Sequence, residues 1–207
     1  TMLAIEKARR LSQNERVIFL CYNKLLVDHL TRTFSQELPN VSFTNLNSIA
    51  SRALNLSADR KEISNFLENI NKYPEIWDFT SIIIDEGQDF DEYHLSLLRV
   101  IAEYSDGSYY VFYDKNQLIQ QRNSLTWVQD IECRLVLTLN CRNTFSIAET
   151  SSKAVGVDKV KMRQIVAGEK PLLKNVSTKE ELIMAMNESI RDLTDSGVTK
   201  DRIVILT

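Results

Sequence analysis

Two adjacent carboxylates, Asp85 and Glu86, follow directly after the nearly all-apolar run Ser81–Ile84 in this chain of 207 residues. The run predicts a strand that is buried on both faces, as in parallel sheets. At its end, the first carboxylate could hold a magnesium ion and the second could orient or deprotonate the attacking water in nucleotide hydrolysis. A plainer interpretation, a solvated acidic turn after an apolar strand, stays open for this pair taken alone.

The elements around this pair alternate between strand and helix. Short β-branched and aromatic runs predict strands over residues 16–21, 41–44, 81–84 and 109–113. Helical spacing of apolar residues predicts helices over residues 2–11, 25–34, 49–54, 63–70 and 93–104. This order favours an α/β fold, a doubly wound parallel sheet with helices on both faces, in which ligands bind at the carboxyl ends of the strands.

The C-terminal part of the chain predicts the beginning of a second α/β domain. A strand over residues 135–139 and a helix from about residue 145 complete the first domain, which we expect to span residues 1–155. The charged, weakly periodic stretch 156–170 is the predicted linker. Residues 171–207 then follow as the second domain, with predicted elements at strand 172–176, helix 179–193 and strand 203–206.

Composition excludes several classes of protein. Hydrophobic residues make up 43% and charged residues 26% of the chain, as in ordinary folded domains, and the formal charge of -3 gives no overall attraction to phosphate backbones. Any nucleic-acid contact would therefore come from a local groove. Cys21, Cys133 and Cys141 form no Cys-x-x-Cys pair, which argues against a zinc or redox site and fits a reducing cytoplasm. The apolar runs are shorter than the ~20 residues that a membrane helix needs, so we expect no membrane partner.

Three runs in the middle of the chain carry a family resemblance. Residues 85–90 (Asp-Glu-Gly-Gln-Asp-Phe) resemble motif II of the UvrD/Rep-type superfamily 1 helicases, and residues 113–117 (Tyr-Asp-Lys-Asn-Gln) are similar to motif III. Residues 139–143 (Leu-Asn-Cys-Arg-Asn) resemble motif IV. The resemblance implies that Gln117 senses the γ-phosphate of ATP, and that Arg142 stabilises transition-state charge there, as an arginine finger does.

Upstream runs extend the resemblance to the beginning of the chain. Val17–Lys24 looks like motif Ia, which touches single-stranded nucleic acid, and Thr44–Ser48 is a weaker match to motif Ib. Thr1 matches the last residue of the family's phosphate-binding loop, Gly-x-x-Gly-x-Gly-Lys-Thr. We therefore expect the chain to be an internal fragment, with the glycines and lysine of this loop and the strand before it lying upstream.

By resemblance, residues 1–155 are a RecA-like P-loop NTPase sheet, motor domain 1A, and residues 171–207 begin motor domain 2A. The expected ligands are ATP and Mg²⁺, with Thr1 and Asp85 at the metal and with Glu86, Gln117 and Arg142 catalytic. All five residues would contact the bound nucleotide. The nucleic-acid partner would be single-stranded DNA or RNA, and the residues expected to contact it are Asn23, Lys24, Asn47 and Arg122.

The resemblance implies an ATP-dependent helicase or translocase, with no turnover from a fragment that lacks the loop lysine. Two departures qualify this expectation. Residues 118–122 (Leu-Ile-Gln-Gln-Arg) lack the aromatics on which relatives stack a base, and residues 54–79 are too few for the helical insertion that grips duplex DNA. The alternative is a nucleotide-sensing or scaffold module that binds in the same pocket without productive turnover. The third interpretation, an unrelated P-loop kinase or transferase, is disfavoured by the motif IV run.

Overall fold

The structure, a computed structural model, describes residues 1–114, 128, 133–137, 139–141, 143–156, 161–162 and 166–205. The chain divides into two compact units, residues 1–133 and residues 134–207. This division groups the helix over residues 145–155 with the second unit, and the predicted domain bounds, residues 1–155, 156–170 and 171–207, stay a prediction.

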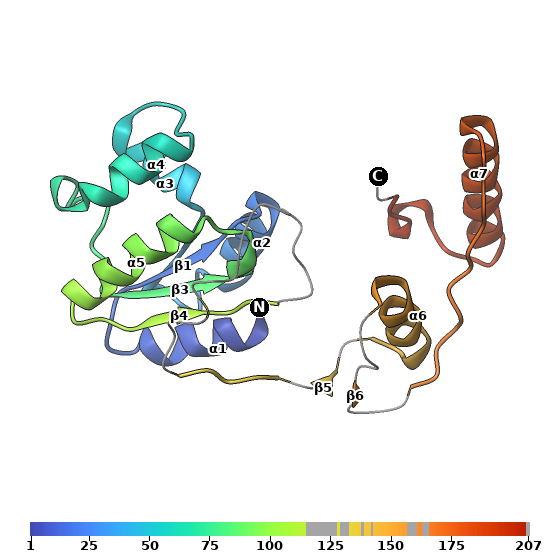
Figure 1. Ribbon diagram of the computed structural model, residues 1–207, viewed down its shortest axis with the longest axis horizontal. Helices are drawn as coiled ribbons and strands as arrows, with labels where there is room; N and C mark the ends of the chain where they lie inside the picture. The colour runs from blue at the N-terminus through green and yellow to red at the C-terminus, as the bar shows by residue number, and fades with distance from the viewer. Residues whose placement is uncertain are drawn as a thin grey trace. The chain divides into compact units, whose positions relative to one another are not determined.

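The first unit is built on one parallel sheet of four strands in the order β2-β1-β3-β4 (Figure 1). The strands are β1 (Val17–Cys21), β2 (Val41–Thr44), β3 (Ser81–Asp85) and β4 (Tyr109–Val111). In the register, Leu20 lies beside both Thr44 and Ile84, so the carboxyl ends of three strands meet at one edge. The predicted α/β class with a parallel sheet is confirmed.

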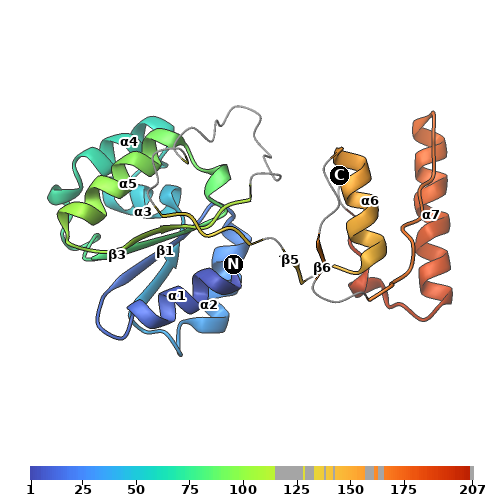
Figure 2. The same cartoon turned by 60° about the horizontal axis from the view of Figure 1, so that its bottom comes forward.

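Helices cover both faces of this sheet (Figure 2). α1 (Met2–Leu11) and α2 (Lys24–Phe34) pack with Phe19 and Ile83 on one face. On the other face, α3 (Leu46–Leu54), α4 (Arg60–Glu68) and α5 (Glu92–Tyr104) pack with Ile18 and Ile82. Successive residues of a strand point to opposite faces, and β1 and β3 are buried throughout because both faces are covered.

Polar side chains fix where the helices begin. Asn23 caps α2, Asn45 caps α3, Asp91 caps α5, and Asp59 forms a reciprocal capping box at α4. Helices α3 and α4 each begin three residues before the start predicted from apolar spacing. The first turns of both helices are mostly polar, so apolar spacing does not reveal where the helices begin. The capping residues Asn45 and Asp59 mark these positions instead.

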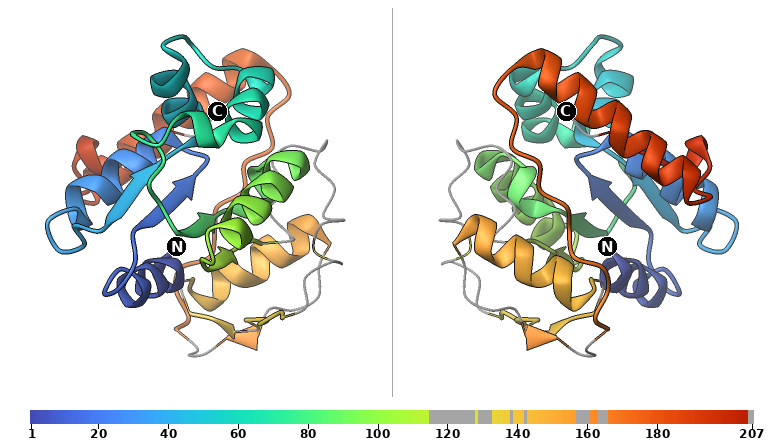
Figure 3. Two further views of the ribbon diagram at one scale, coloured as in Figure 1. Left: turned by 90° about the vertical axis from the view of Figure 1, so that its left-hand side faces the viewer. Right: turned by 90° about the vertical axis from the view of Figure 1, so that its right-hand side faces the viewer.

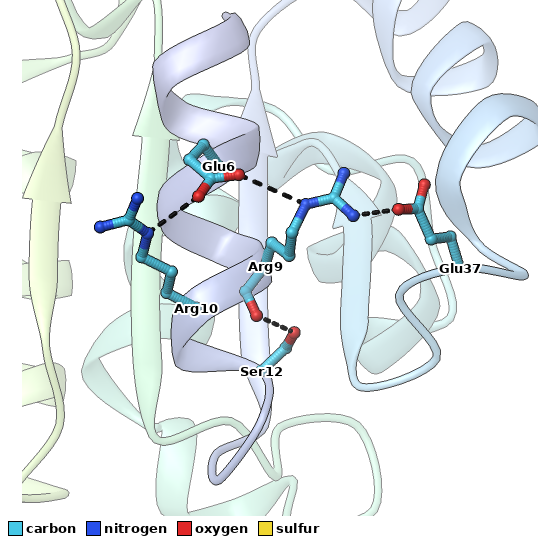
Figure 4. Close-up of polar contacts among 5 residues, drawn as sticks. All are labelled: Glu6, Arg9, Arg10, Ser12 and Glu37. Carbon is cyan, nitrogen blue, oxygen red and sulfur yellow. Dashed lines mark hydrogen bonds and ion pairs between the residues drawn. The ribbon is translucent and has the colours of Figure 1, made fainter.

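The outer surface of α1 carries a small network of ion pairs (Figure 4). Glu6 pairs with Arg10 at 2.8 Å and with Arg9 at 3.4 Å, and Arg9 also contacts Glu37, which follows α2. The Ser12 hydroxyl donates a hydrogen bond to the carbonyl oxygen of Arg9 at 3.0 Å. Exposed pairs of this kind contribute little stability and weaken with salt, so the packing of α1 on the sheet rests on its buried apolar face.

The second unit contains less regular structure. Two short strands, β5 (Leu139–Asn140) and β6 (Lys161–Met162), pair in parallel. Between them lies α6 (Phe145–Val155), whose first turn is held by a backbone hydrogen bond from Phe145 to Val166 at 2.8 Å. Further along, α7 (Lys179–Asp195) is a single unbroken helix, shown in red in the right view of Figure 3, and a 3₁₀ turn follows over Lys200–Arg202.

Some predictions for this unit were wrong. Residues 135–137, 172–176 and 203–205 belong to no strand, although their apolar and β-branched residues favour one. Strand propensity measures how well side chains fit a paired, half-buried surface, and these residues are largely exposed, with no ladder partner within the described ranges. Residues 161–162, which fall in the predicted linker, do pair as β6.

A buried histidine joins α4 to α5. His94 is 5% exposed, and its Nε2 atom lies 3.0 Å from the Ser64 hydroxyl and 3.3 Å from the carbonyl oxygen of Arg60. Burial lowers the pKa of His94 below its usual value, outweighing the opposite effect of Asp91. The folded state therefore favours the neutral imidazole.

We predict that the free energy of unfolding decreases as the pH falls below about 6.5, the ordinary histidine pKa. The unfolded chain then takes up a proton that the folded chain does not, which costs up to about 1.4 kcal/mol per pH unit. Urea denaturation between about pH 7.5 and 6 should show this slope, and His94→Gln should flatten it. His29→Gln, which changes an exposed histidine, is the matched control and should keep the slope. An equal slope in His94→Gln would contradict the assignment.

Candidate active site

Asp85 occupies the end of the central strand β3, at the edge where the parallel strands finish. It pairs in register with Cys21 of β1, and its side chain is 2% exposed. The Oδ1 atom lies 3.2 Å from the backbone nitrogen of Thr1, the residue that precedes α1. A carboxylate is favourable near a helix N-terminus because the peptide dipoles leave partial positive charge there. Thr1 and Asp85, predicted to share a site, therefore lie side by side.

The second oxygen of Asp85 points to a ligand. Oδ2 is buried and has no hydrogen-bond partner among the described residues. A buried charged oxygen without a partner is costly, so a cation is a fitting occupant. No group of three acidic, histidine or cysteine side chains in the described ranges could hold a metal by itself. This arrangement fits Mg²⁺, which takes one or two carboxylates and completes its shell with water and substrate phosphates.

Glu86 adopts an unusual backbone conformation directly after β3. Its φ of 56° and ψ of 47° lie in the left-handed region, which residues other than glycine rarely adopt. The turn leads the chain into the short 3₁₀ helix η2 (Gly87–Asp89). Such conformations cost about 1–3 kcal/mol and cluster at functional sites. The half-buried carboxylate is thereby placed next to Asp85, at the same edge of the sheet.

Gln88 holds this carboxylate in place, although the sequence pattern assigned it no role. Its Nε2 atom donates a hydrogen bond to Oε2 of Glu86 at 2.7 Å, and its Oε1 atom accepts one from the backbone of Asp114 at 3.0 Å. The residue is 2% exposed. The sequence could have indicated this role because Gln88 stands two positions after Glu86. Its other partner, Asp114, is 26 residues further along the chain and could not be inferred from spacing.

Neighbouring groups at this edge are shifted toward their protonated forms. Burial and then the charge of Glu86 raise the pKa of Asp89, whose Oδ1 atom has no partner among the described residues. Burial, followed by the charge of Asp85, raises the pKa of the Cys21 thiol to about 12. The raised pKa favours the thiol form of Cys21 at neutral pH, which disfavours a role as a nucleophile because that role needs the thiolate.

Three of the residues predicted to contact nucleic acid follow β1 and β2 at the same edge. Lys24 is exposed at the first turn of α2. Asn23 accepts a hydrogen bond from the backbone of Leu25 at 2.8 Å, and Asn47 donates one to the carbonyl oxygen of Ala58 at 3.1 Å. The side chains of both asparagines thus have structural partners. The exposed Lys24 places a positive charge at this edge.

Tyr22 is an exposed residue of the run Val17–Lys24, and the sequence assigned it no role of its own. It lies between β1 and α2, is 51% exposed, and contacts Phe90 edge to face with ring centroids 6.1 Å apart. Its position directly after the buried strand β1 was the sequence feature that could have pointed to it.

Three predicted site residues, Gln117, Arg122 and Arg142, lie outside the described residues. The predicted convergence of Gln117 and Arg142 on Asp85 and Glu86 therefore stays a prediction. Within the described ranges, the structure brings together Thr1, Asp85 and Glu86.

No model of a protein family matches the chain, and no curated protein matches it either. None of the helices in the described part of the chain combines the length and apolar character that crossing a membrane requires.

The left-handed conformation of Glu86 predicts an unusual response to glycine. Glu86→Gly should have a free energy of unfolding about 1 kcal/mol higher than Glu86→Ala, because only glycine adopts positive φ without strain. Both variants lose the carboxylate, so the comparison isolates the backbone. Chemical denaturation of the two proteins measures the difference. At Ser96, in the middle of α5, the same comparison should reverse in sign, since glycine weakens a helix. A less stable Glu86→Gly would show that the turn is unstrained.

Proposed function

We propose that the chain is the nucleotide-binding core of an ATP-driven motor on single-stranded nucleic acid, a helicase or translocase of the UvrD/Rep type. One observation carries the proposal: the buried Asp85 has an oxygen without a partner among the described residues, lies beside the N-terminus of α1, and is followed by Glu86 at the carboxyl edge of a parallel sheet. Ligands of open α/β sheets bind at this edge.

In this proposal the first unit provides a RecA-like ATP site. Thr1 and Asp85 would hold Mg²⁺, which neutralises charge on the phosphates when bound. The N-terminus of α1 faces the same point, and helix N-termini favour phosphate because of their free backbone N–H groups and their dipole. We propose residues 1–155 as motor domain 1A, residues 156–170 as a linker, and residues 171–207 as the beginning of motor domain 2A.

Glu86 is the proposed general base. Its carboxylate is held by Gln88 and adjoins the Asp85 side of the edge, so it could accept a proton from a water that attacks the γ-phosphate. Gln117 and Arg142 are proposed as the γ-phosphate sensor and the charge-stabilising arginine, on the strength of their motifs.

The single-stranded partner would bind across the ends of β1 and β2. Helices α2 and α3 both begin there, and Lys24 adds a positive charge that is open to solvent. Most contacts of proteins with nucleic acid are made to phosphates, for which this combination is suited. Arg122 is proposed as a further contact.

A second candidate is a nucleotide-sensing module without coupling to nucleic acid. The observation in its favour is that the side chains of Asn23 and Asn47 cap or brace their own segments. The two functions differ in one measurable property, stimulation of ATP hydrolysis by nucleic acid.

Glu86→Gln in the full-length protein is expected to lower the rate of ATP hydrolysis by about 10²- to 10⁴-fold, because the amide keeps the shape of the side chain but cannot act as a base. ATP binding should change little. Single-turnover hydrolysis and equilibrium binding of an ATP analogue measure the two quantities. A variant that hydrolyses ATP within a few-fold of the wild type would remove Glu86 from this role.

Single-stranded DNA or RNA is expected to stimulate ATP hydrolysis by the full-length protein, and the stimulation should weaken as salt rises because phosphate contacts release counterions. Phosphate release with and without an oligonucleotide, at two salt concentrations, measures this. Lys24→Ala and Arg122→Ala should each raise the oligonucleotide concentration needed. Lys72→Ala, which changes an exposed lysine in the 3₁₀ turn before β3, is the matched control and should behave as the wild type. Hydrolysis that ignores nucleic acid would favour the sensing module.

A further inference from the structure

The hydrogen-bond ladder between β3 and β4 continues past the end of β4. The backbone of Phe112 donates to the carbonyl oxygen of Ile84 at 2.8 Å, and the backbone of Gly87 donates to the carbonyl oxygen of Phe112 at 2.8 Å. At Asp114 a side chain replaces the neighbouring backbone, because the N–H group of Asp114 donates to Oε1 of Gln88 at 3.0 Å. Gln88 thus forms the next rung of the ladder.

The other end of the same amide holds Glu86. Gln88 Nε2 donates to Oε2 of Glu86 at 2.7 Å, a short distance typical of hydrogen bonds to a charged acceptor. Within the described ranges, Gln88 is the one donor to this carboxylate. Since Gln88 is buried and both ends of its amide are engaged, its rotamer is defined.

We propose that Gln88 is a positioning residue that holds the Glu86 carboxylate in its working orientation and ties that orientation to the backbone that follows β4. This inference rests on the proposed role of Glu86 as general base. The left-handed turn at Glu86 gives the carboxylate its place, and the Gln88 amide gives it its direction. Displacing a reacting group by about 1 Å can cost roughly 10²-fold in rate, so such a residue affects catalysis without touching substrate.

The chemistry of the amide suggests two informative substitutions. Methionine has nearly the length of glutamine and makes neither hydrogen bond. Glutamate keeps the length and an acceptor for Asp114, but it replaces the donor to Glu86 with a second carboxylate that repels it. A purely structural role of Gln88 in anchoring Asp114 would therefore be retained in Gln88→Glu and lost in Gln88→Met.

The test measures kcat for ATP hydrolysis and the Kd of a non-hydrolysable ATP analogue in the full-length protein. Gln88→Met and Gln88→Glu should each lower kcat by about 10- to 100-fold, while the Kd changes by less than about threefold. In single-turnover measurements on the Glu86→Gln background, either substitution should lower the residual rate by less than about threefold, because the group that Gln88 positions is already inactive. Gln13→Met, which changes an exposed glutamine, is the control and should leave kcat unchanged.

Each outcome bears on the inference. A kcat within about twofold of the wild type in Gln88→Glu would overturn it, and so would an equal loss of rate on the Glu86→Gln background. If Gln88→Met does not fold, Gln88→Glu decides alone, since it keeps the bond to Asp114. A wild-type protein that hydrolyses no ATP would overturn the proposed function and this inference with it, whereas an active, Glu86-dependent protein indifferent to Gln88 would overturn the inference only.

Discussion

A buried carboxylate at the end of a buried strand constrains the rest of this structure. Taking the charge of Asp85 out of water is costly unless it is compensated. One oxygen faces the backbone nitrogen of Thr1 at 3.2 Å, where the beginning of α1 supplies partial positive charge. The other oxygen is buried without a partner in the described ranges. The sheet must hold this residue firmly, and the apolar neighbours of β3, with helices over both faces, do so.

Two further acidic side chains, Glu86 and Asp89, lie at this edge beside Asp85. Glu86 is held in a left-handed turn by the path of the chain from β3 into η2, and its carboxylate is fixed by Gln88. Asp89 lies close enough that the charge of Glu86, after burial, raises its pKa. Several acidic groups gathered at one edge repel each other unless a cation joins them. A divalent cation at this edge would reduce that repulsion, and Mg²⁺ is the cation that we propose.

The parallel sheet could be predicted because its signals are local and strong. The strand at residues 81–84 is almost wholly apolar. The alternation of strands and helices predicts a parallel sheet, so the carboxyl ends of its strands are expected at one edge. The left-handed turn at Glu86 and the hydrogen bond from the Asp114 backbone to Gln88 could not be predicted, since they depend on contacts between residues far apart in the sequence. The predictions of strands over residues 172–176 and 203–206 were wrong for the described residues, which extend to residue 205, because a sequence does not show whether a neighbouring strand pairs with them.

A crystal structure of the full-length protein with Mg²⁺ and a non-hydrolysable ATP analogue would show directly whether Asp85 holds the ion. We expect the ion to lie within about 2.1 Å of a phosphate oxygen and to be bound through Asp85, directly or through a water. The γ-phosphate should face Glu86, with the N-terminus of α1 beside the phosphates. A nucleotide bound elsewhere, or an Asp85 Oδ2 atom satisfied by a protein donor with no ion nearby, would contradict it.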